Sequence, residues 1–253
     1  LTNDTGVGGD NITNNAAFTV GGKETDATVQ YSTNGTSWSA SYTATAGSNT
    51  VFARQTDVAG NVSAASAGYT FTLDTTVAAP SLSLASDTGS SSIDKLTNVS
   101  VVNVTGLEAG ASWKYYNGSA WINGTGNTFT ISNDPADNVV ERIVKVQQTD
   151  VAGNTATSAE FTYKLDVKAP NAPGLAFVDT GTSNTDKITR DGRVSVTYED
   201  SATWSYSTNG GVTWNSGTGS FVTLTGDGAK SIVARQTDAA GNTSTSSAAL
   251  TFT

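Results

Sequence analysis

An aspartate in a recurring turn motif is the feature of this chain with the clearest chemical potential. Its three copies, Asp57, Asp150 and Asp238, lie 93 and 88 residues apart, a spacing that fits a small β domain and not a solenoid repeat. The chain is therefore expected to hold three similar domains, called repeats 1, 2 and 3. The motif, called the TDxAGN turn, is RQTDVAGN at Arg54–Asn61, QQTDVAGN at Gln147–Asn154 and RQTDAAGN at Arg235–Asn242.

A second acidic motif keeps the same spacing along the chain. It is Asp-Thr-Gly followed by another aspartate, and we call it the DTG loop. Its aspartates are Asp4 and Asp10, Asp87 and Asp94, and Asp179 and Asp186. The composition restricts what such acids can do, because the chain contains neither histidine nor cysteine. The usual zinc, copper and thiolate sites are excluded, and so are catalytic triads that need an imidazole base.

Oxygen ligands remain, and they suit hard cations. The 22 acidic residues outnumber the 13 basic ones and give a net charge of −9. This balance disfavours nucleic acid and anionic membranes as partners and favours a cation such as calcium. No apolar run approaches the roughly 18 residues of a membrane helix, and no secretory signal opens the chain. We therefore expect no direct membrane insertion.

Short alternating stretches between turn residues predict an all-β fold. Glycine occurs 26 times, and no segment shows a sustained helical period. Six or seven short strands per repeat are typical of a two-sheet sandwich. In repeat 2 the predicted strands are Ser81–Ala85, Val99–Thr105, Ser112–Tyr116, Thr128–Ser132, Arg142–Gln148 and Glu160–Leu165.

The predicted boundaries are 1–74 for repeat 1, 75–166 for repeat 2 and 167–253 for repeat 3. Both ends of the sequence fall inside the repeat pattern, so we expect an excerpt of a longer array, with any targeting signal outside it. The expected partners are neighbouring repeats of the same chain, and a monomer is expected.

Four phrases, together with the DTG loop and the TDxAGN turn, carry a family resemblance that covers the whole chain. They are LDTTVAAP at Leu73–Pro80, LDVKAPNAP at Leu165–Pro173, YSTNGTSW at Tyr31–Trp38 and YSTNGGVTW at Tyr206–Trp214. The chain resembles the tandem bacterial Ig-like repeats of large surface adhesins, including RTX-type adhesins. The resemblance implies Ig-like Greek-key β-sandwiches arranged end to end as an extended rod, an extracellular location at the bacterial cell surface, and calcium bound where repeats join.

One departure from the Ig pattern concerns the core. A tryptophan often lies on the third strand of an Ig domain, and Trp113 and Trp204 fit that position, whereas repeat 1 has Val29 there. A smaller residue buries less apolar surface, so repeat 1 is expected to be the least stable of the three.

Ig topology predicts where the acids meet. The DTG loop and the TDxAGN turn lie at opposite poles of one sandwich, so in a head-to-tail string the loop of one repeat faces the turn of the next. Two carboxylates about 4 Å apart repel by roughly 4 kcal/mol, so such a junction needs a cation, and Ca²⁺ accepts six to eight oxygens. The predicted metal ligands are Asp4, Asp10, Asp74 and Asp150 at the first junction and Asp87, Asp94, Asp166 and Asp238 at the second.

Other readings of these residues stay open. Each aspartate could instead bond its own backbone within a turn. Asp-Thr-Gly is also the active-site triplet of aspartic proteases, but three copies a domain length apart do not form the facing pair, so no enzyme is expected. A carbohydrate- or ligand-binding module is the alternative to a structural spacer, with Tyr115, Tyr116, Trp121 and Trp214 as exposed aromatics that could stack on sugars.

Overall fold

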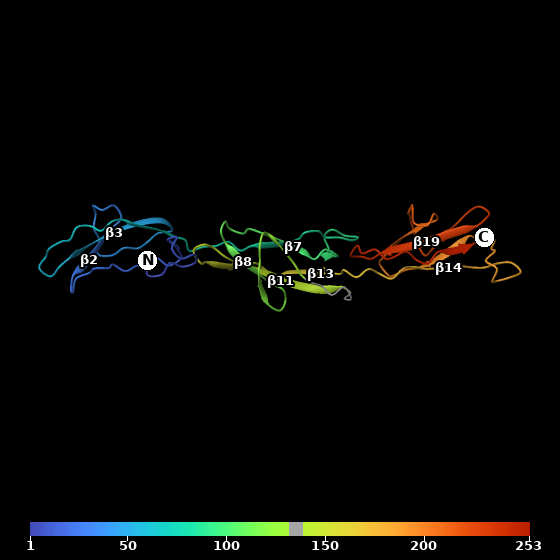
Figure 1. Ribbon diagram of the computed structural model, residues 1–253, viewed down its shortest axis with the longest axis horizontal. Coiled ribbons are helices and arrows are strands. Elements are labelled where there is room, and N and C mark those ends of the chain that lie inside the picture. The colour runs from blue at the N-terminus through green and yellow to red at the C-terminus, as the bar shows by residue number, and fades with distance from the viewer. Residues whose placement is uncertain (132–138) are drawn as a thin grey trace. The chain divides into compact units, whose positions relative to one another are not determined.

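The structure is a computed structural model that describes residues 1–131 and 139–253 (Figure 1). All regular elements in these residues are β-strands, which confirms the all-β prediction. Among them there is no helix long and apolar enough to cross a membrane. The predicted end of one strand at Ser132 lies outside the described residues.

Within the described residues, twenty strands follow one another along the chain. Repeat 1 has β1 (Ile12–Thr13), β2 (Thr28–Ser32), β3 (Gly47–Thr56) and β4 (Tyr69–Leu73). Repeat 2 has β5 (Ser81–Leu84), β6 (Leu96–Thr97), β7 (Val101–Thr105), β8 (Ser112–Tyr116), β9 (Trp121–Asn123), β10 (Thr128–Thr130), β11 (Val140–Thr149), β12 (Thr155–Thr157) and β13 (Phe161–Leu165). Repeat 3 has β14 (Gly174–Phe177), β15 (Arg193–Thr197), β16 (Thr203–Ser207), β17 (Asn215–Ser216), β18 (Phe221–Thr223), β19 (Lys230–Thr237) and β20 (Leu250–Phe252).

By its internal contacts the chain forms two compact units. The first contains Leu1–Leu82, Asn103–Phe129 and Val144–Glu160, and the second contains Ser83–Val102, Thr130–Ile143 and Phe161–Thr253. Repeat 1 thus belongs to the first unit and repeat 3 to the second, and the residues of repeat 2 are divided between them. The boundaries at residues 74 and 166 stay a prediction.

Repeat 3 is a β-sandwich. Its sheets have the strand orders β14-β15-β18 and β17-β16-β19-β20. Val194 of the first sheet and Ile232 and Phe252 of the second are buried together in its core. Phe177 of β14 stacks on Phe252 with ring centroids 4.7 Å apart, which joins the edge strand of one sheet to the other sheet.

The six strands predicted in repeat 2 are present, each to within two residues at its described ends, as β5, β7, β8, β10, β11 and β13. The short strands β6, β9 and β12 were not predicted. Trp113 on β8 and Trp204 on β16 are buried at the expected third-strand position. Each indole Nε1–H donates to a carbonyl, that of Gly126 or Gly219, so the buried polar atom is satisfied.

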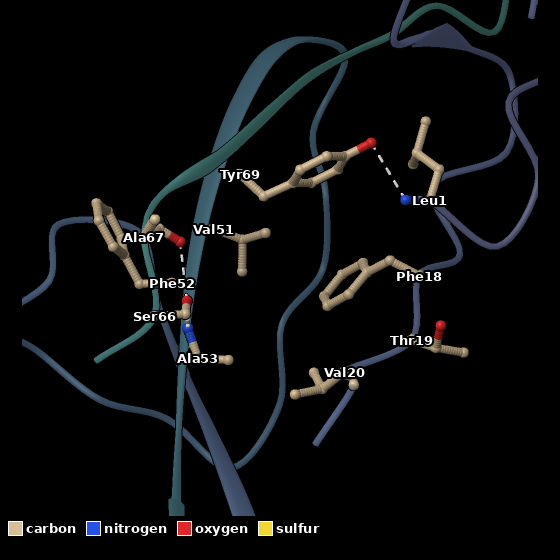
Figure 2. A pocket seen from close by; sticks show the side chains of 11 residues that line it. Leu1, Phe18, Thr19, Val20, Val51, Phe52, Ala53, Ser66, Ala67 and Tyr69 are labelled. Carbon is tan, nitrogen blue, oxygen red and sulfur yellow. Dashed lines mark hydrogen bonds between the residues drawn. The ribbon is translucent and has the colours of Figure 1, made fainter. Parts of the chain in front are cut away.

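Repeat 1 differs from the others in having one four-stranded sheet, of order β1-β4-β3-β2. Residues 14–27 and 40–46, all of which the structure describes, contain no strand. Figure 2 shows the result, a hollow of about 350 Å³ around which Phe18, Val20, Val51 and Tyr69 face one another. In repeat 3 a second sheet covers the core on this side. The positions equivalent to residues 174–176 of its edge strand β14 would fall before or at Leu1, and Leu1 itself lines the hollow.

Candidate functional site at the repeat joints

The DTG loop of repeat 1 contacts the TDxAGN turn of repeat 2 directly. We call this contact the first joint, and all of its residues belong to the first compact unit. The hydroxyl Oγ1 of Thr5 donates to the carbonyl oxygen of Ala152 over 2.6 Å. The amide of Val7 donates to the carbonyl oxygen of Val151 over 3.0 Å. The two loops therefore meet as the sequence predicted.

Gly6 is required by this approach. Its φ is +74°, a left-handed conformation that side chains other than glycine rarely adopt. A Cβ at this position would overlap the carbonyl oxygen of Val151, which is backbone and cannot move aside as a side chain could. The glycine of Asp-Thr-Gly is thus what lets the two backbones touch.

The second joint, within the second compact unit, repeats the same contacts with different residues. Thr88 Oγ1 donates to the carbonyl oxygen of Ala240 over 2.7 Å, and the amide of Ser90 donates to that of Ala239 over 3.3 Å. Gly89 has φ +88°, and a Cβ there would overlap the carbonyl oxygen of Ala239. Two joints of the same chain therefore use equivalent atoms.

The asparagine of each TDxAGN turn fastens the linker from the preceding repeat. Asn154 Nδ2 donates to the carbonyl oxygen of Asp74 over 2.9 Å, and Asn242 Nδ2 donates to that of Asp166 over 2.9 Å. Each amide group is oriented by the aspartate of its own turn, since Nδ2 also donates to Oδ2 of Asp150 or Asp238. These aspartates act through asparagine on the joint.

A buried glutamine fastens each linker further along. Gln148 Nε2 donates to the carbonyl oxygen of Ala78 over 2.6 Å. The backbone amide of Ala78 donates to Glu108 Oε1 over 3.1 Å. In the second linker Gln236 Nε2 donates to the backbone carbonyl oxygen of Asn171 over 2.6 Å. The backbone amide of Asn171 donates to Glu199 Oε1 over 3.2 Å. One linker residue in each joint is therefore held at both its N–H and its C=O.

The predicted metal ligands lie in or beside these joints, and each accepts hydrogen bonds within its own loop or turn. Asp4 Oδ2 accepts from the amide of Gly9 over 2.7 Å, and Asp87 Oδ2 accepts from that of Lys95 over 3.0 Å. Asp10, Asp74, Asp94, Asp150, Asp166 and Asp238 likewise accept from backbone amides two to four residues onward. Among residues 1–131 and 139–253, no three acidic side chains form a group that could hold a metal ion.

One carboxylate oxygen in each DTG loop nevertheless has no partner. Oδ1 of Asp4, Asp87 and Asp179 is buried without a hydrogen bond. A buried anionic oxygen is costly unless something positive faces it, so each loop offers one ligand of the kind Ca²⁺ prefers. Because the other acids are not gathered around it, an ion there would depend on backbone carbonyl oxygens and water for most of its coordination.

At the second joint, burial and neighbouring carboxylates affect the pKa of Asp166. Burial raises the pKa of Asp166, and the nearby carboxylates of Asp238 and Glu199 raise it further. At the turn of repeat 1, hydrogen bonds from the side chain and amide of Asn61 lower the pKa of Asp57.

The aromatic residues considered for sugar binding do not form a flat platform. Tyr116 and Trp121 are tilted by 49° with centroids 5.6 Å apart, and Tyr115 is stacked on Phe129 at 4.4 Å. The Trp214 ring is covered by the Arg235 guanidinium at 4.1 Å. Tyr115 and Trp214 thus each have one ring face covered by a partner within the same repeat.

The comparisons with known proteins add little to this picture. No protein-family model matches the chain, and no curated protein matches it. Solved structures with some similarity include the FN1–FN3 domains of chicken CNTN1, with 14% identity over 88% of this chain and 89% of that chain and a TM-score of 0.39. The fibronectin(III)-like modules of Clostridium thermocellum CbhA share 12% identity over 60% and 82%, with a TM-score of 0.37. A tetra-tandem repeat in the extending region of a large adhesion protein shares 16% over 90% and 66%, with a TM-score of 0.28. TM-scores this low do not support a structural assignment, so the β-sandwich assignment rests on the strands and sheets of this structure.

Sequence reasoning missed the residues that make the joints. It concentrated on aspartates and did not assign roles to the threonine and glycine of each DTG loop or to the asparagine of each turn. The signal was present, because Thr-Gly follows the first aspartate in all three loops and asparagine ends all three turns.

Proposed function

We propose that this chain is a structural spacer, an extender segment of an extracellular bacterial surface adhesin that holds a binding domain away from the cell. The observation that carries the proposal is the repetition of one joint, with equivalent atoms, at Thr5–Ala152 and at Thr88–Ala240. A chain that binds a ligand needs one well-formed site, whereas a spacer needs every junction to resist bending. The partners of each repeat are then its neighbours in the chain.

The joints supply that resistance through several modest interactions. Each hydrogen bond is worth about 0.5–1.5 kcal/mol net, and each joint contains two loop–loop bonds as well as those that fasten the linker. The linker prolines Pro80 and Pro173 are buried, and their fixed φ lowers the entropy lost when the linker is ordered. Bending a joint would therefore break several contacts at once.

Substituting the joint glycines tests this role. In Gly6→Ala or Gly89→Ala the new Cβ collides with a backbone carbonyl, so the affected joint should open while the repeats stay folded. Gly181→Ala is a matched control, because Gly181 also has positive φ but has nothing within 4 Å. With spin labels on cysteines introduced in adjacent repeats, we expect a broader distance distribution across the altered joint alone. Equal widths in all three variants would contradict the spacer role.

Calcium at the joints is the second part of the proposal. It is supported by the unpartnered, buried Oδ1 of Asp4 and Asp87 and by the position of Asp74 and Asp166 in the linkers. When bound, the ion would neutralise these carboxylates and stiffen the linkers further. The carboxylates that would hold it are Asp4, Asp10, Asp74 and Asp150 at the first joint and Asp87, Asp94, Asp166 and Asp238 at the second.

A titration with calcium separates the two parts. Calorimetry should give one or more ions per joint, and small-angle scattering should show a larger maximum dimension with calcium than with chelator. Asp74→Ala should remove this response at the first joint and leave the second unchanged. If no heat and no change of dimension are measured, calcium is wrong, whereas the spacer role still depends on the glycine variants.

A further inference from the structure

Repeat 2 differs from its neighbours at the first residue of the TDxAGN motif. Repeats 1 and 3 have Arg54 and Arg235 there, whereas repeat 2 has Gln147. Val146 and Gln148 on either side are buried, so Gln147 points to the outer face of its sheet, away from the core. The three equivalent residues each lie opposite one residue of the neighbouring strand, in chain order Gln30, Lys114 and Ser205.

In repeats 1 and 3 this arginine covers the tryptophan of the neighbouring hairpin. The guanidinium of Arg54 lies 4.4 Å from the ring centroid of Trp38, and that of Arg235 lies 4.1 Å from that of Trp214. Each guanidinium also donates a hydrogen bond across the sheet to the residue opposite it. Both tryptophans are half-buried.

In repeat 2 the equivalent place is open. Gln147 turns toward β12 and away from the hairpin, since its Nε2 donates to Thr157 Oγ1 over 3.1 Å. Trp121, in the position of Trp38 and Trp214, is 41% exposed. A hollow of about 370 Å³ opens on this face of the sheet formed by β8, β9 and β11. Lys114, which lines it, places its ammonium 5.3 Å from the Trp121 ring centroid.

The hollow offers hydrogen-bonding groups and one positive charge. Its polar lining consists of one ammonium, two carboxamides and two hydroxyls, those of Lys114, Asn123, Gln147, Ser112 and Thr149. Within the described part of the chain no acidic residue lines it, although the chain carries a net charge of −9. Lys114 has no acidic partner among residues 1–131 and 139–253. Such a lining suits a ligand with several hydroxyl groups and a negative charge.

We infer that this hollow binds an acidic sugar residue of a polysaccharide, with its carboxylate at Lys114 and hydroxyl groups at Asn123 and Gln147. The exposed part of the Trp121 ring supplies an apolar wall for one face of the sugar. A carboxylate is favoured over a neutral group because charge-assisted hydrogen bonds are the stronger ones. The residues that line the hollow make none of the hydrogen bonds of the joints, so the site does not depend on the spacer role.

The test uses the whole ¹⁵N-labelled chain and tri-galacturonate, with the methyl ester of that sugar as an uncharged probe. A chelator is present, so that calcium cannot bridge the sugar to the acids of the chain. We expect the amide signals of Lys114, Asn123 and Gln147 to shift, and those of Arg54 and Arg235 to stay in place. The methyl ester should bind about tenfold more weakly, and equal affinity for both probes would overturn the inference.

Two single variants separate this site from general attraction to positive charge. Lys114→Gln removes the ammonium that faces the carboxylate, so it should weaken binding about tenfold. Lys145→Gln is the matched control, because it removes the same charge from a lysine that is paired with Glu160 and does not line the hollow. It should leave the affinity unchanged.

A charge-conserving exchange gives the sharpest test. Lys114→Gln combined with Gln147→Arg reproduces the pair of Gln30 and Arg54 in repeat 1, in which Arg54 Nε donates to Gln30 Oε1 over 3.0 Å. The new arginine should cover Trp121 and close the hollow, so binding should be lost although the net charge is unchanged. Absence of shifts at the hollow, equal weakening by both single variants, or undiminished binding by the double variant would each overturn the inference. None of these results affects the glycine variants that test the spacer role.

Discussion

Repeats 1 and 3 carry the same turn motifs but bury their interiors differently. In repeat 3, β15 lies between β14 and β18, and its Val194 and Val196 are buried. The equivalent residues of repeat 1, Phe18 and Val20, are half-buried and line the hollow in Figure 2. Equivalent motifs therefore specify equivalent loops, while the core depends on whether a strand covers it.

The spacing establishes this equivalence, because Phe18 and Val194 each lie eight residues after the second aspartate of their DTG loop, and a backbone hydrogen bond recurs at this edge in repeats 1 and 2. The amide of Thr2 donates to the carbonyl oxygen of Ala17 over 2.7 Å, as the amide of Ala85 donates to that of Val101 over 3.0 Å in repeat 2. Beyond that point β5 continues along β7. In repeat 1 the positions equivalent to residues 81–83 would fall before Leu1, so in this sequence Ala17–Gly21 has no such strand beside it. Full burial of one aliphatic side chain is worth about 1.5–3 kcal/mol, so the uncovered residues of repeat 1 contribute less than their counterparts.

The largest expected difference is in hydrogen exchange. The amides of Val194 and Val196 lie in a strand paired on both sides, so they should exchange only through cooperative opening of repeat 3. The amides of Phe18 and Val20 should exchange at least about 100-fold faster, since they open locally. Exchange followed by NMR checks this, and equal protection at the two pairs would show that repeat 1 has a closed core.

Truncation of equivalent core residues should have the next largest effect. Ile232 and Val51 occupy the same position on β19 and β3, four residues before the glutamine of the TDxAGN motif. Ile232→Ala should destabilise repeat 3 by about 2–5 kcal/mol, because it leaves a cavity in a closed core. Val51 is also buried, at 4% exposure, but it lines the hollow, so Val51→Ala extends an existing space and should cost less.

A size-matched control removes the difference between isoleucine and valine. Val144 occupies the same position in repeat 2, which has a second sheet of order β10-β7-β5, so Val144→Ala should cost more than Val51→Ala. Local free energies of unfolding from exchange and mass spectrometry report each repeat separately. If Val51→Ala costs as much as Val144→Ala, the hollow does not weaken repeat 1.

Sequence reasoning predicted the strands and the meeting of loops because both follow from periodic patterns and chain topology. Trp113 and Trp204 were placed correctly for the same reason. It left open whether the joint aspartates bond within their own loops or meet around an ion, because Asp10 can equally accept the amide of Ile12 or face another acid, and a few ångströms decide between them. Phe18 and Val20 alternate with polar residues as those of a covered strand do, and they lie open here because the positions equivalent to β5 would fall before or at Leu1.

The smallest expected effect is acid sensitivity at the exposed turn of repeat 1. Hydrogen bonds from Asn61 lower the pKa of Asp57 in the folded chain. The folded state therefore gains stability from this carboxylate above its unfolded pKa of about 3.9, and loses it as the pH falls through the lower folded value. The amide of Asn61, which donates to Asp57 Oδ1, should shift in NMR spectra over that acidic range, and Asp57→Asn should abolish the shift.

In repeat 3 the equivalent turn is covered, because Ala239 and Ala240 accept hydrogen bonds from the DTG loop of repeat 2. The amides of the repeat 3 turn should therefore stay protected from exchange at the acidic pH at which the turn of repeat 1 opens. Loss of protection in both turns at the same pH would mean that the joint adds nothing to the stability of the turn it covers.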